Sequence, residues 1–156
     1  MCKPRDVTTL TALPGRACSI AAALEVVGDR WALLAVREVS FGRHRFSEIL
    51  EGTGAPRDRL AARLKALVAA GVLERRQYQE SPARFDYHLT GAGQDLVPVL
   101  RALMAWGDRW VVDQPPMTLM HHDHVLDAQP VCRTCGEAVS SDDVHRRDNV
   151  AEGAGT

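Results

Sequence analysis

The chain has 156 residues, of which 46% are hydrophobic and 25% are charged, and its formal net charge is −1. This composition is typical of a globular protein, and no apolar run has the length of a membrane-spanning helix, so we expect no membrane partner. The N-terminal residues also lack the apolar stretch of a secretory signal. We therefore expect a cytoplasmic protein whose four cysteines do not form a disulfide framework.

The near-zero net charge hides an uneven distribution of charged residues. Residues 57–86 contain seven lysines or arginines and four acidic residues, a balance of +3. Residues 108–156 contain four arginines and nine acidic residues, a balance of −5. Because affinity for nucleic acid comes mostly from lysine and arginine, residues 57–86 are a candidate nucleic-acid contact that the acidic C-terminal part masks in the total.

In chain order, the sequence predicts a mobile arm followed by three helices. Residues 1–17 contain prolines and threonines without an apolar period, which is typical of an irregular arm. A first helix is capped by Ser19 and ended by Gly28, with apolar residues at helical spacing between them. Asp29 caps a second helix, and a third, shorter helix presents Phe46 on its inner face.

A fourth helix and a hairpin follow. Pro56 suits the first helical position, where its missing N–H has no cost, and Gly71 ends this helix after a row of leucines at helical spacing. Residues 72–78 and 84–89 are rich in strand-favouring residues and are separated by a segment of turn composition. These two segments predict a β-hairpin.

The domain organisation follows from these elements and from the composition of the C-terminal part. Residues 18–113 form the folded domain, and residues 114–145 form an extension that begins with a prolyl linker. Residues 146–156 are polar and rich in glycine and alanine, which predicts a disordered tail.

The order of helix, short helix, tight turn, helix and hairpin predicts a mainly α protein with a small β-hairpin, a winged helix-turn-helix. The N-terminal half of the fourth helix fits the major groove of double-stranded DNA, where arginine makes paired hydrogen bonds to guanine. Arginines of the hairpin would contact neighbouring phosphates or the minor groove. The alternative for each single arginine is a solvated side chain. The candidate DNA-binding residues are Pro56, Arg57, Asp58, Arg59, Arg63, Arg75, Arg76 and Arg84.

Several motifs in this order resemble the HxlR-type regulators, relatives of the MarR group. They are residues 18–21 (Cys-Ser-Ile-Ala), 28–31 (Gly-Asp-Arg-Trp), 45–49 (Arg-Phe-Ser-Glu-Ile), 71–73 (Gly-Val-Leu), 82–90 (Pro-Ala-Arg-Phe-Asp-Tyr-His-Leu-Thr), 96–98 (Leu-Val-Pro) and 106–107 (Trp-Gly). The resemblance implies a cytoplasmic bacterial homodimer that binds a partly palindromic operator and represses a neighbouring gene in response to a reactive or small-molecule signal. The family commonly has Ile-Ser before its recognition helix, where this chain has Ala55 and Pro56.

The last predicted helix indicates a homodimer. It runs from Thr90 to about Val112, with a kink or break expected at Pro98. Its apolar surface is larger than one small winged domain can cover, which favours a second copy as the partner. The alternative is that this surface packs within the monomer against the first helix. The apolar surface includes Leu100, Leu103, Trp106 and Trp110. In the alternative, these residues would contact Ile20 and Leu24 of the first helix.

Cys18 is a candidate sensor of oxidants or electrophiles. It precedes a helix N-terminus, which favours the reactive thiolate form of a nearby thiol. The resemblance implies the same role, since several of these regulators use a cysteine at this place. A buried, inert cysteine is the alternative.

A second cysteine cluster lies in the extension. Cys132 and Cys135, followed by glycine, have the spacing of half a tetrahedral zinc site, and His124 with either His122 or His121 would complete it. Such a closed site would hold one structural zinc ion and stabilise the fold of a segment with little apolar content. A redox dithiol and a segment without chemistry are the alternatives.

The sequence does not predict an enzyme, since it shows no phosphate-binding loop and no nucleophile motif. The alternative function is a protein-interaction module that does not bind DNA and carries the zinc-stapled extension as a second surface. A pocket lined by Trp31, Phe46 and Met104 would suit a small apolar effector, and core packing is the competing role for these side chains.

Overall fold

A computed structural model describes residues 18–147 of the chain. The predicted mobile arm and most of the predicted disordered tail lie outside the described residues. The chain divides into two compact units, residues 1–113 and 114–156. None of the helices within residues 18–147 is long and apolar enough to cross a membrane.

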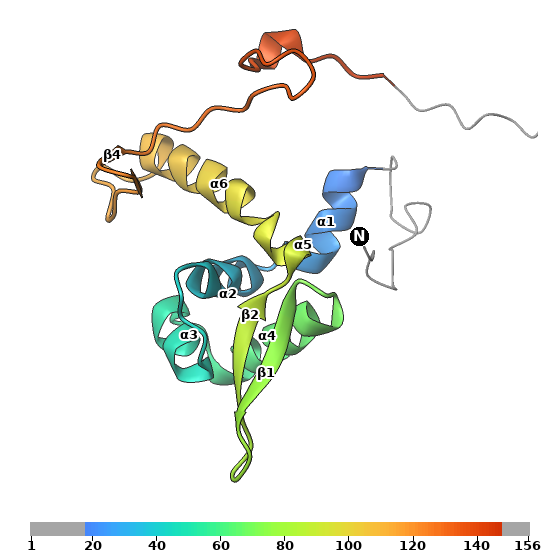
Figure 1. Cartoon of the computed structure of the whole chain (residues 1–156), viewed down its shortest axis with the longest axis vertical. Helices are drawn as coiled ribbons and strands as arrows, with labels where there is room; N and C mark the ends of the chain where they lie inside the picture. Colours follow the sequence, from blue (N-terminus) through green and yellow to red (C-terminus); the bar gives the residue numbers. More distant parts are fainter. Residues whose placement is uncertain (1–17, 148–156) are drawn as a thin grey trace, which may run out of the picture. The chain divides into compact units, whose positions relative to one another are not determined.

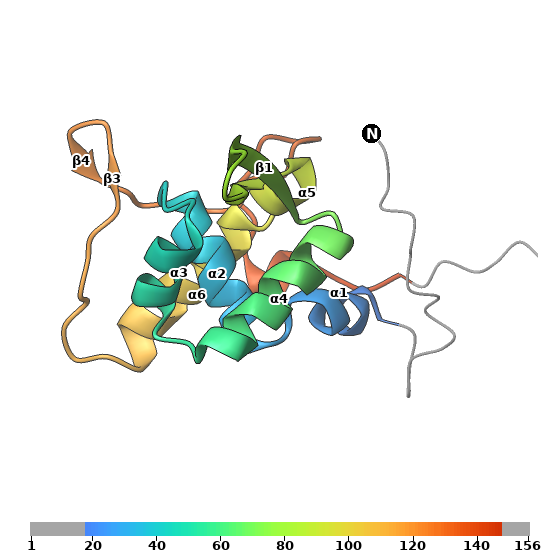
Figure 2. The ribbon, with the colours of Figure 1, turned by 90° about the horizontal axis from the view of Figure 1, so that it is seen from below.

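The first unit contains six helices and one hairpin among its described residues (Figure 1). They are α1 (Ser19–Val27), α2 (Arg30–Ser40), α3 (Phe46–Thr53), α4 (Arg57–Ala69), β1 (Leu73–Gln79), β2 (Arg84–Leu89), α5 (Gly91–Gln94) and α6 (Val97–Trp110). The prediction of a mainly α winged helix-turn-helix with a small hairpin is confirmed. Figure 2 shows α4 in front of α2, with α3 on one side and α1 on the other.

The helix ends follow local sequence signals to within one residue. The Asp29 carboxylate caps α2 by accepting a hydrogen bond of 2.9 Å from the N–H of Trp31, as predicted. Ser19 was expected to cap α1, but the structure has Cys18 as the N-cap residue and Ser19 as the first residue of the helix. Cys18 has extended backbone angles and makes no side-chain cap, so the predicted cap is displaced by one residue.

The predicted break in the last helix is confirmed. The hydroxyl of Thr90 caps the short helix α5 by accepting a 3.2 Å hydrogen bond from Gly93. The chain then interrupts the helix and starts again as α6, with Pro98 in its first turn. Proline is tolerated there because the first N–H groups of a helix have no partner within it, whereas inside a helix it removes a hydrogen bond.

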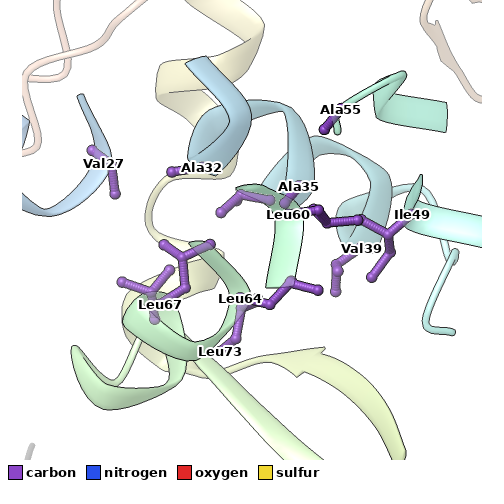
Figure 3. Close-up of a cluster of buried hydrophobic side chains, with 12 residues drawn as sticks. Val27, Ala32, Ala35, Val39, Ile49, Ala55, Leu60, Leu64, Leu67 and Leu73 are labelled. Atoms are coloured by element: carbon purple, nitrogen blue, oxygen red, sulfur yellow. The ribbon is translucent and has the colours of Figure 1, made fainter. Parts of the chain in front are cut away.

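One hydrophobic core holds α1 to α4 and the base of the hairpin together. Its fully buried members come mainly from α2, α3, α4 and β1 (Figure 3). The largest are Val36, Ile49, Leu60, Leu64, Leu67 and Leu73. Leu96 and Leu100 pack against this cluster, but α6 has no buried residue of its own. Most of α6 therefore extends beyond the core that anchors it.

The strands β1 and β2 pair antiparallel and form the wing. Leu73 pairs with Leu89 at its base, and the register continues to a bulge between Gln77 and Gln79. Residues 80–83, which connect the strands at the tip, are exposed. Figure 1 shows the wing extending away from the helices, which places its distal half in solvent.

The second unit has little regular structure among its described residues. β3 (Met120–His121) and β4 (His124–Val125) form a two-stranded hairpin, and Ser141–Asp143 forms a single 3-10 turn. No residue between 114 and 147 is buried. This unit is therefore ordered without an apolar core.

Candidate nucleic-acid interface

The helix α4 turns a basic face to solvent, opposite its buried leucines. Arg57 and Arg59 are exposed in its first turn, with Asp58 between them. Lys65 is also exposed and lies on the same row as Arg57, because helical residues four apart are neighbours. The exposed face thus carries three cationic side chains and one acidic side chain.

The start of α4 lacks a side-chain cap. Pro56 is the N-cap residue, with φ −57° and ψ 137°, and the helix begins at Arg57. The prediction that Pro56 occupies the first helical position is therefore wrong by one residue, since its extended ψ places it outside the helix. The N–H groups of the first turn have no partner within the helix, and the helix dipole makes such an end attractive to phosphate.

Two consecutive residues at the start of α3 connect α4 with the wing. The guanidinium carbon of Arg57 lies 5.0 Å from the ring centroid of Phe46. The guanidinium carbon of Arg45 lies 5.2 Å from the ring centroid of Tyr78 in β1. Contacts of this kind restrain the arginine side chains while their charged groups stay accessible. Residues 45 and 46 therefore lie between the first turn of α4 and the wing, and one side chain of the pair contacts each of them.

Arg63 differs from the other arginines of α4 because an acidic partner holds it. Its Nε lies 3.4 Å from Oδ2 of Asp29, the residue that caps α2, and about a third of each side chain is exposed. This is an ion pair without hydrogen-bond geometry, and Nε makes no other hydrogen bond. Arg63 thus ties α4 to the start of α2, and its charge is partly compensated.

The arginines of the wing have unequal surroundings. Arg75 stacks on Phe85, with its guanidinium carbon 3.6 Å from the ring centroid. Arg76 lies on the other face of the wing, where its Nε donates a 2.7 Å hydrogen bond to Glu74. Arg84 is exposed at the start of β2. Arg84 and Arg75 are the wing arginines without an acidic side chain bound to them, and we expect these two to contribute most to phosphate binding.

The base of the wing is attached to the segment before α3. The N–H of Tyr87 donates to the carbonyl of His44 at 2.9 Å, and Nδ1 of His44 lies 2.8 Å from the carbonyl oxygen of Tyr87. The rings of His44 and His88 stack with centroids 4.3 Å apart. Burial, followed by the neighbouring His44 and Arg76 charges, lowers the pKa of His88. The wing is therefore held by its backbone and by a stacked pair of histidines.

A carboxylate caps α3 beside this attachment. Oε2 of Glu48 accepts hydrogen bonds from the N–H groups of Arg45 and His44, at 2.9 and 3.0 Å. These bonds stabilise the charged form, so they lower the pKa of Glu48. The Glu48 carboxylate therefore fixes the start of α3, and with it the position of Arg45 beside the wing.

A buried charge network joins α2 to the end of α3. Glu38 is 4% exposed and lies between Arg37, whose Nη2 is 2.5 Å from Oε1, and Arg43, whose Nε is 3.3 Å from Oε2. Arg37 also donates a 2.8 Å hydrogen bond to the carbonyl of Gly52. This network sets the turn between α3 and α4, and so the direction in which α4 leaves the core.

A stripe of apolar side chains is exposed along α6. Val99, Leu103, Trp106 and Trp110 are 54–65% exposed and recur at the spacing of one helix face. Ile20 and Leu24 of α1 are also exposed. The alternative that this surface packs against α1 inside the monomer is therefore wrong for Leu103, Trp106 and Trp110, whereas Leu100, predicted as part of it, packs against the core.

The predicted metal ligands lie in a cysteine pair and in a group of three histidines, in which the ring centroids of His121 and His122 are 4.2 Å apart. The N–H groups of Cys135 and Thr134 donate hydrogen bonds to the Cys132 sulfur and lower the pKa of its thiol. In the hairpin, His121 is paired with His124 across the strands, and the two ring centroids are 5.4 Å apart. Among residues 18–147, no group of three or more histidine, cysteine or acidic side chains is arranged to hold a metal ion.

Sequence reasoning missed Arg45 and Lys65 as candidate DNA-binding residues. The sequence gives no sign of a role for Arg45, because its proximity to Tyr78 depends on the folding of the wing. Lys65 has a signal in the sequence, its spacing of two helical turns from Arg57. Of the predicted site residues, Arg57, Asp58 and Arg59 share the exposed start of α4, whereas Arg63 faces Asp29.

Comparison with known proteins identifies the family of this chain. Residues 26–115 match the family described as HxlR-like helix-turn-helix. The chain belongs to the HxlR family. An uncharacterized HTH-type transcriptional regulator of Mycobacterium tuberculosis is 41% identical over 130 residues, which cover 81% of this chain and 82% of the relative.

Solved structures agree with this family. The crystal structure of PA1607, a candidate transcription factor, is 30% identical with a TM-score of 0.75 and covers 85% of this chain and 96% of its own. The candidate transcription factor PA1374 from Pseudomonas aeruginosa is 32% identical, with a TM-score of 0.63 and coverage of 88% and 96%. This HxlR protein is therefore a DNA-binding transcriptional regulator.

Proposed function

We propose that this HxlR protein is a homodimeric repressor that inserts the two copies of α4 into the major groove of a partly palindromic operator. The exposed basic start of α4 carries this proposal. Arg57 and Arg59 would contact base edges and phosphates, because arginine makes bidentate hydrogen bonds to guanine. Lys65, Arg75 and Arg84 would bind flanking phosphates, which supply affinity without sequence preference. Such a regulator acts in the cytoplasm, where the bacterial chromosome lies.

Arg63 has a different role in this proposal from that given by the sequence alone. Its ion pair with Asp29 makes it a residue that positions α4, and Asp58 is an acidic side chain that favours the helix start through the dipole. We therefore expect substitution of Arg63 to affect stability as well as DNA affinity.

A DNA-binding measurement with arginine variants tests the contact residues. Fluorescence anisotropy with the DNA upstream of the protein's own gene, over a series of salt concentrations, is the assay. We expect Arg57→Ala and Arg59→Ala each to weaken binding by about 10–100-fold, which corresponds to roughly 1–3 kcal/mol. Arg84→Ala should reduce the slope of log affinity against log salt by about 1, since one phosphate contact is lost.

The matched control is Arg101→Ala, because Arg101 is an exposed arginine on α6, away from α4 and the wing. Its affinity for DNA should equal that of the unchanged protein. A triple variant of Arg57, Arg59 and Arg84 to alanine that folds and still binds with unchanged affinity would show that α4 is not the recognition helix.

The stripe on α6 supports the homodimer. Its four large apolar side chains are too exposed for a stable monomer surface, and a two-fold operator requires two recognition helices about one DNA turn apart. Trp106→Glu should produce a monomer in sedimentation velocity, and DNA affinity should fall with it. Arg101→Glu places a glutamate at an exposed position of α6 outside the stripe and should leave the dimer intact. A dimeric Trp106→Glu protein would contradict this interface.

Repression and its signal require a cellular assay. A reporter gene behind the protein's own upstream DNA should be expressed more strongly in cells without the regulator. Cys18, the partly buried N-cap residue of α1, stays a predicted sensor of oxidants. If Cys18 has this role, Cys18→Ser should abolish the release of operator DNA that peroxide causes. If the signal is instead a small apolar effector, it should act equally on the unchanged protein and on Cys18→Ser.

A further inference from the structure

The extension is ordered although it has no apolar core. None of the described residues 114–147 is buried, and Val125, Val131 and Val144 are more than half exposed. Short segments of this kind usually need a disulfide, a metal ion or a partner for stability. Cys132 and Cys135 are free thiols in this structure.

The cysteine pair has a backbone arrangement suited to a thiolate-bound metal. The Gly136 N–H donates a 2.7 Å hydrogen bond to the carbonyl of Cys132, and Gly136 has φ +79°, a value that favours glycine. The N–H of Cys132 donates to the carbonyl of Glu137 at 2.9 Å, and Val131 pairs with Ala138. These hydrogen bonds close a tight turn around the two cysteines.

Cys132 and Cys135 both lie within this turn, which the hydrogen bond between Gly136 and Cys132 closes. Two sulfurs bound to one tetrahedral zinc ion lie about 4 Å apart, because each Zn–S bond is about 2.3 Å. The turn therefore presents two of the four ligands that a zinc site needs.

The histidine pair in the hairpin has matching geometry. His121 and His124 are cross-strand partners, so their side chains lie on one face of the hairpin. Their centroid distance of 5.4 Å is close to the separation of about 5 Å expected for two imidazoles on one tetrahedral ion with Zn–N bonds of about 2.0–2.1 Å. His122 lies in the turn with φ +55° and is not part of the strand pairing.

A carboxylate lies near one ring nitrogen of His124. Oδ1 of Asp123 is 3.6 Å from Nδ1 of His124. Ligating histidines commonly place one ring nitrogen beside a carboxylate and bind the metal with the other. This arrangement would suit metal binding through Nε2 of His124.

We propose that the extension binds one Zn²⁺ ion through Cys132, Cys135, His121 and His124, and that this ion brings the hairpin and the cysteine turn together. Residues 125–131 join the two pairs and would fold back when the ion binds. The two thiols lose their protons to solvent on binding, and the two imidazoles bind as neutral rings. The site is closed, with no open position for water, so its role is structural.

Metal content and a cobalt titration of the full-length protein test this proposal. The protein is purified under reducing conditions, freed of metal with a chelator, and titrated with Zn²⁺ or with Co²⁺ as a spectroscopic probe. We expect one ion per chain and the visible absorption bands of tetrahedral cobalt with thiolate ligands. Metal should also protect residues 114–147 from proteolysis and leave the helical signal of the winged domain unchanged in circular dichroism.

Single substitutions separate the four ligands from their neighbours. Cys132→Ser and Cys135→Ser should weaken metal binding by more than the roughly 10–100-fold that loss of an outer-shell partner costs, and His121→Asn and His124→Asn should weaken it by a similar factor. The matched controls are His122→Asn and His145→Asn, which remove histidines of the same extension. Both should bind Co²⁺ with unchanged affinity and spectrum.

Three outcomes would overturn the proposal. The first is the absence of stoichiometric metal binding by the reduced protein. The second is a loss of affinity in His122→Asn as large as that in His121→Asn. The third is half an ion per chain with unchanged binding in His121→Asn and His124→Asn, because the ion would then be shared by the cysteine turns of two copies.

Discussion

The winged domain and the C-terminal extension are stabilised in different ways. Residues 18–113 enclose a core of twelve buried hydrophobic residues, and burial of apolar area is the dominant favourable term in folding. In residues 114–147, backbone hydrogen bonds, tight turns and a short β-hairpin are the ordered features. One short chain can therefore stabilise its winged domain by apolar burial and its extension by hydrogen bonds and turns.

The strongest test of this difference compares the effect of substituting a core leucine with the effect of substituting a valine of the extension. Leu64 is fully buried, whereas Val131 is 53% exposed. We expect Leu64→Ala to lower the free energy of unfolding by about 2–5 kcal/mol, because it removes apolar contacts and leaves a cavity. Val131→Ala should change it by no more than about 0.5 kcal/mol. Chemical denaturation followed by helical circular dichroism measures both, and equal effects would remove the distinction between the two regions.

Two glycines sharpen the comparison within the first unit. A Cβ atom at Gly52 would collide with the carboxylate of Glu38, which its two arginine partners hold in place. Gly52→Ala should therefore destabilise the protein by about 1–3 kcal/mol. A Cβ at Gly107 meets no atom within 4 Å, so Gly107→Ala in α6 should stabilise the protein by about 0.5–1 kcal/mol. If Gly52→Ala instead stabilised the protein, the Glu38 side chain would be free to move away from position 52.

The smallest expected effect is a pH dependence at the base of the wing. The pKa of His88 in the folded protein is lowered, chiefly by burial, from an ordinary value of about 6.5. Its neutral form is favoured by folding, so its contribution is complete above about pH 6.5 and is lost as the pH falls towards the folded-state pKa. His88→Asn should reduce the loss of stability between about pH 7.5 and about pH 5.5.

Denaturation at both pH values measures the effect of His88→Asn. The matched control is His145→Asn in the extension, an exposed histidine outside the core, which should keep the pH dependence of the unchanged protein. An equal pH dependence in all three proteins would show that the wing does not unfold together with the core.

Most of the fold could be predicted from the sequence because its signals are local. Asp29 and Thr90 cap helices through their own side chains, and Pro98 restarts a helix where a proline is tolerated. The errors at Ser19 and Pro56 are of one residue, since adjacent positions at a helix start compete for the same role.

The details of the site could be predicted only in part. Periodicity showed that Arg57 and Arg59 lie on the solvent face of α4. It could not show that Arg63 faces Asp29, because this pair depends on the crossing of two helices. Likewise, His124 pairs with His121 and not with His122 because of the hairpin register. A shift of the register by one residue would change this partner.

The contact between Glu38 and Gly52 also constrains how the family can vary. Since a larger residue at position 52 would occupy the space of the Glu38 carboxylate, a change at one position is tolerated only after a change at the other. The two arginines that flank Glu38 would lose their shared partner in the same step. We therefore expect positions 37, 38, 43 and 52 to vary together among related sequences, while the exposed residues of α4 diversify independently as operators diverge.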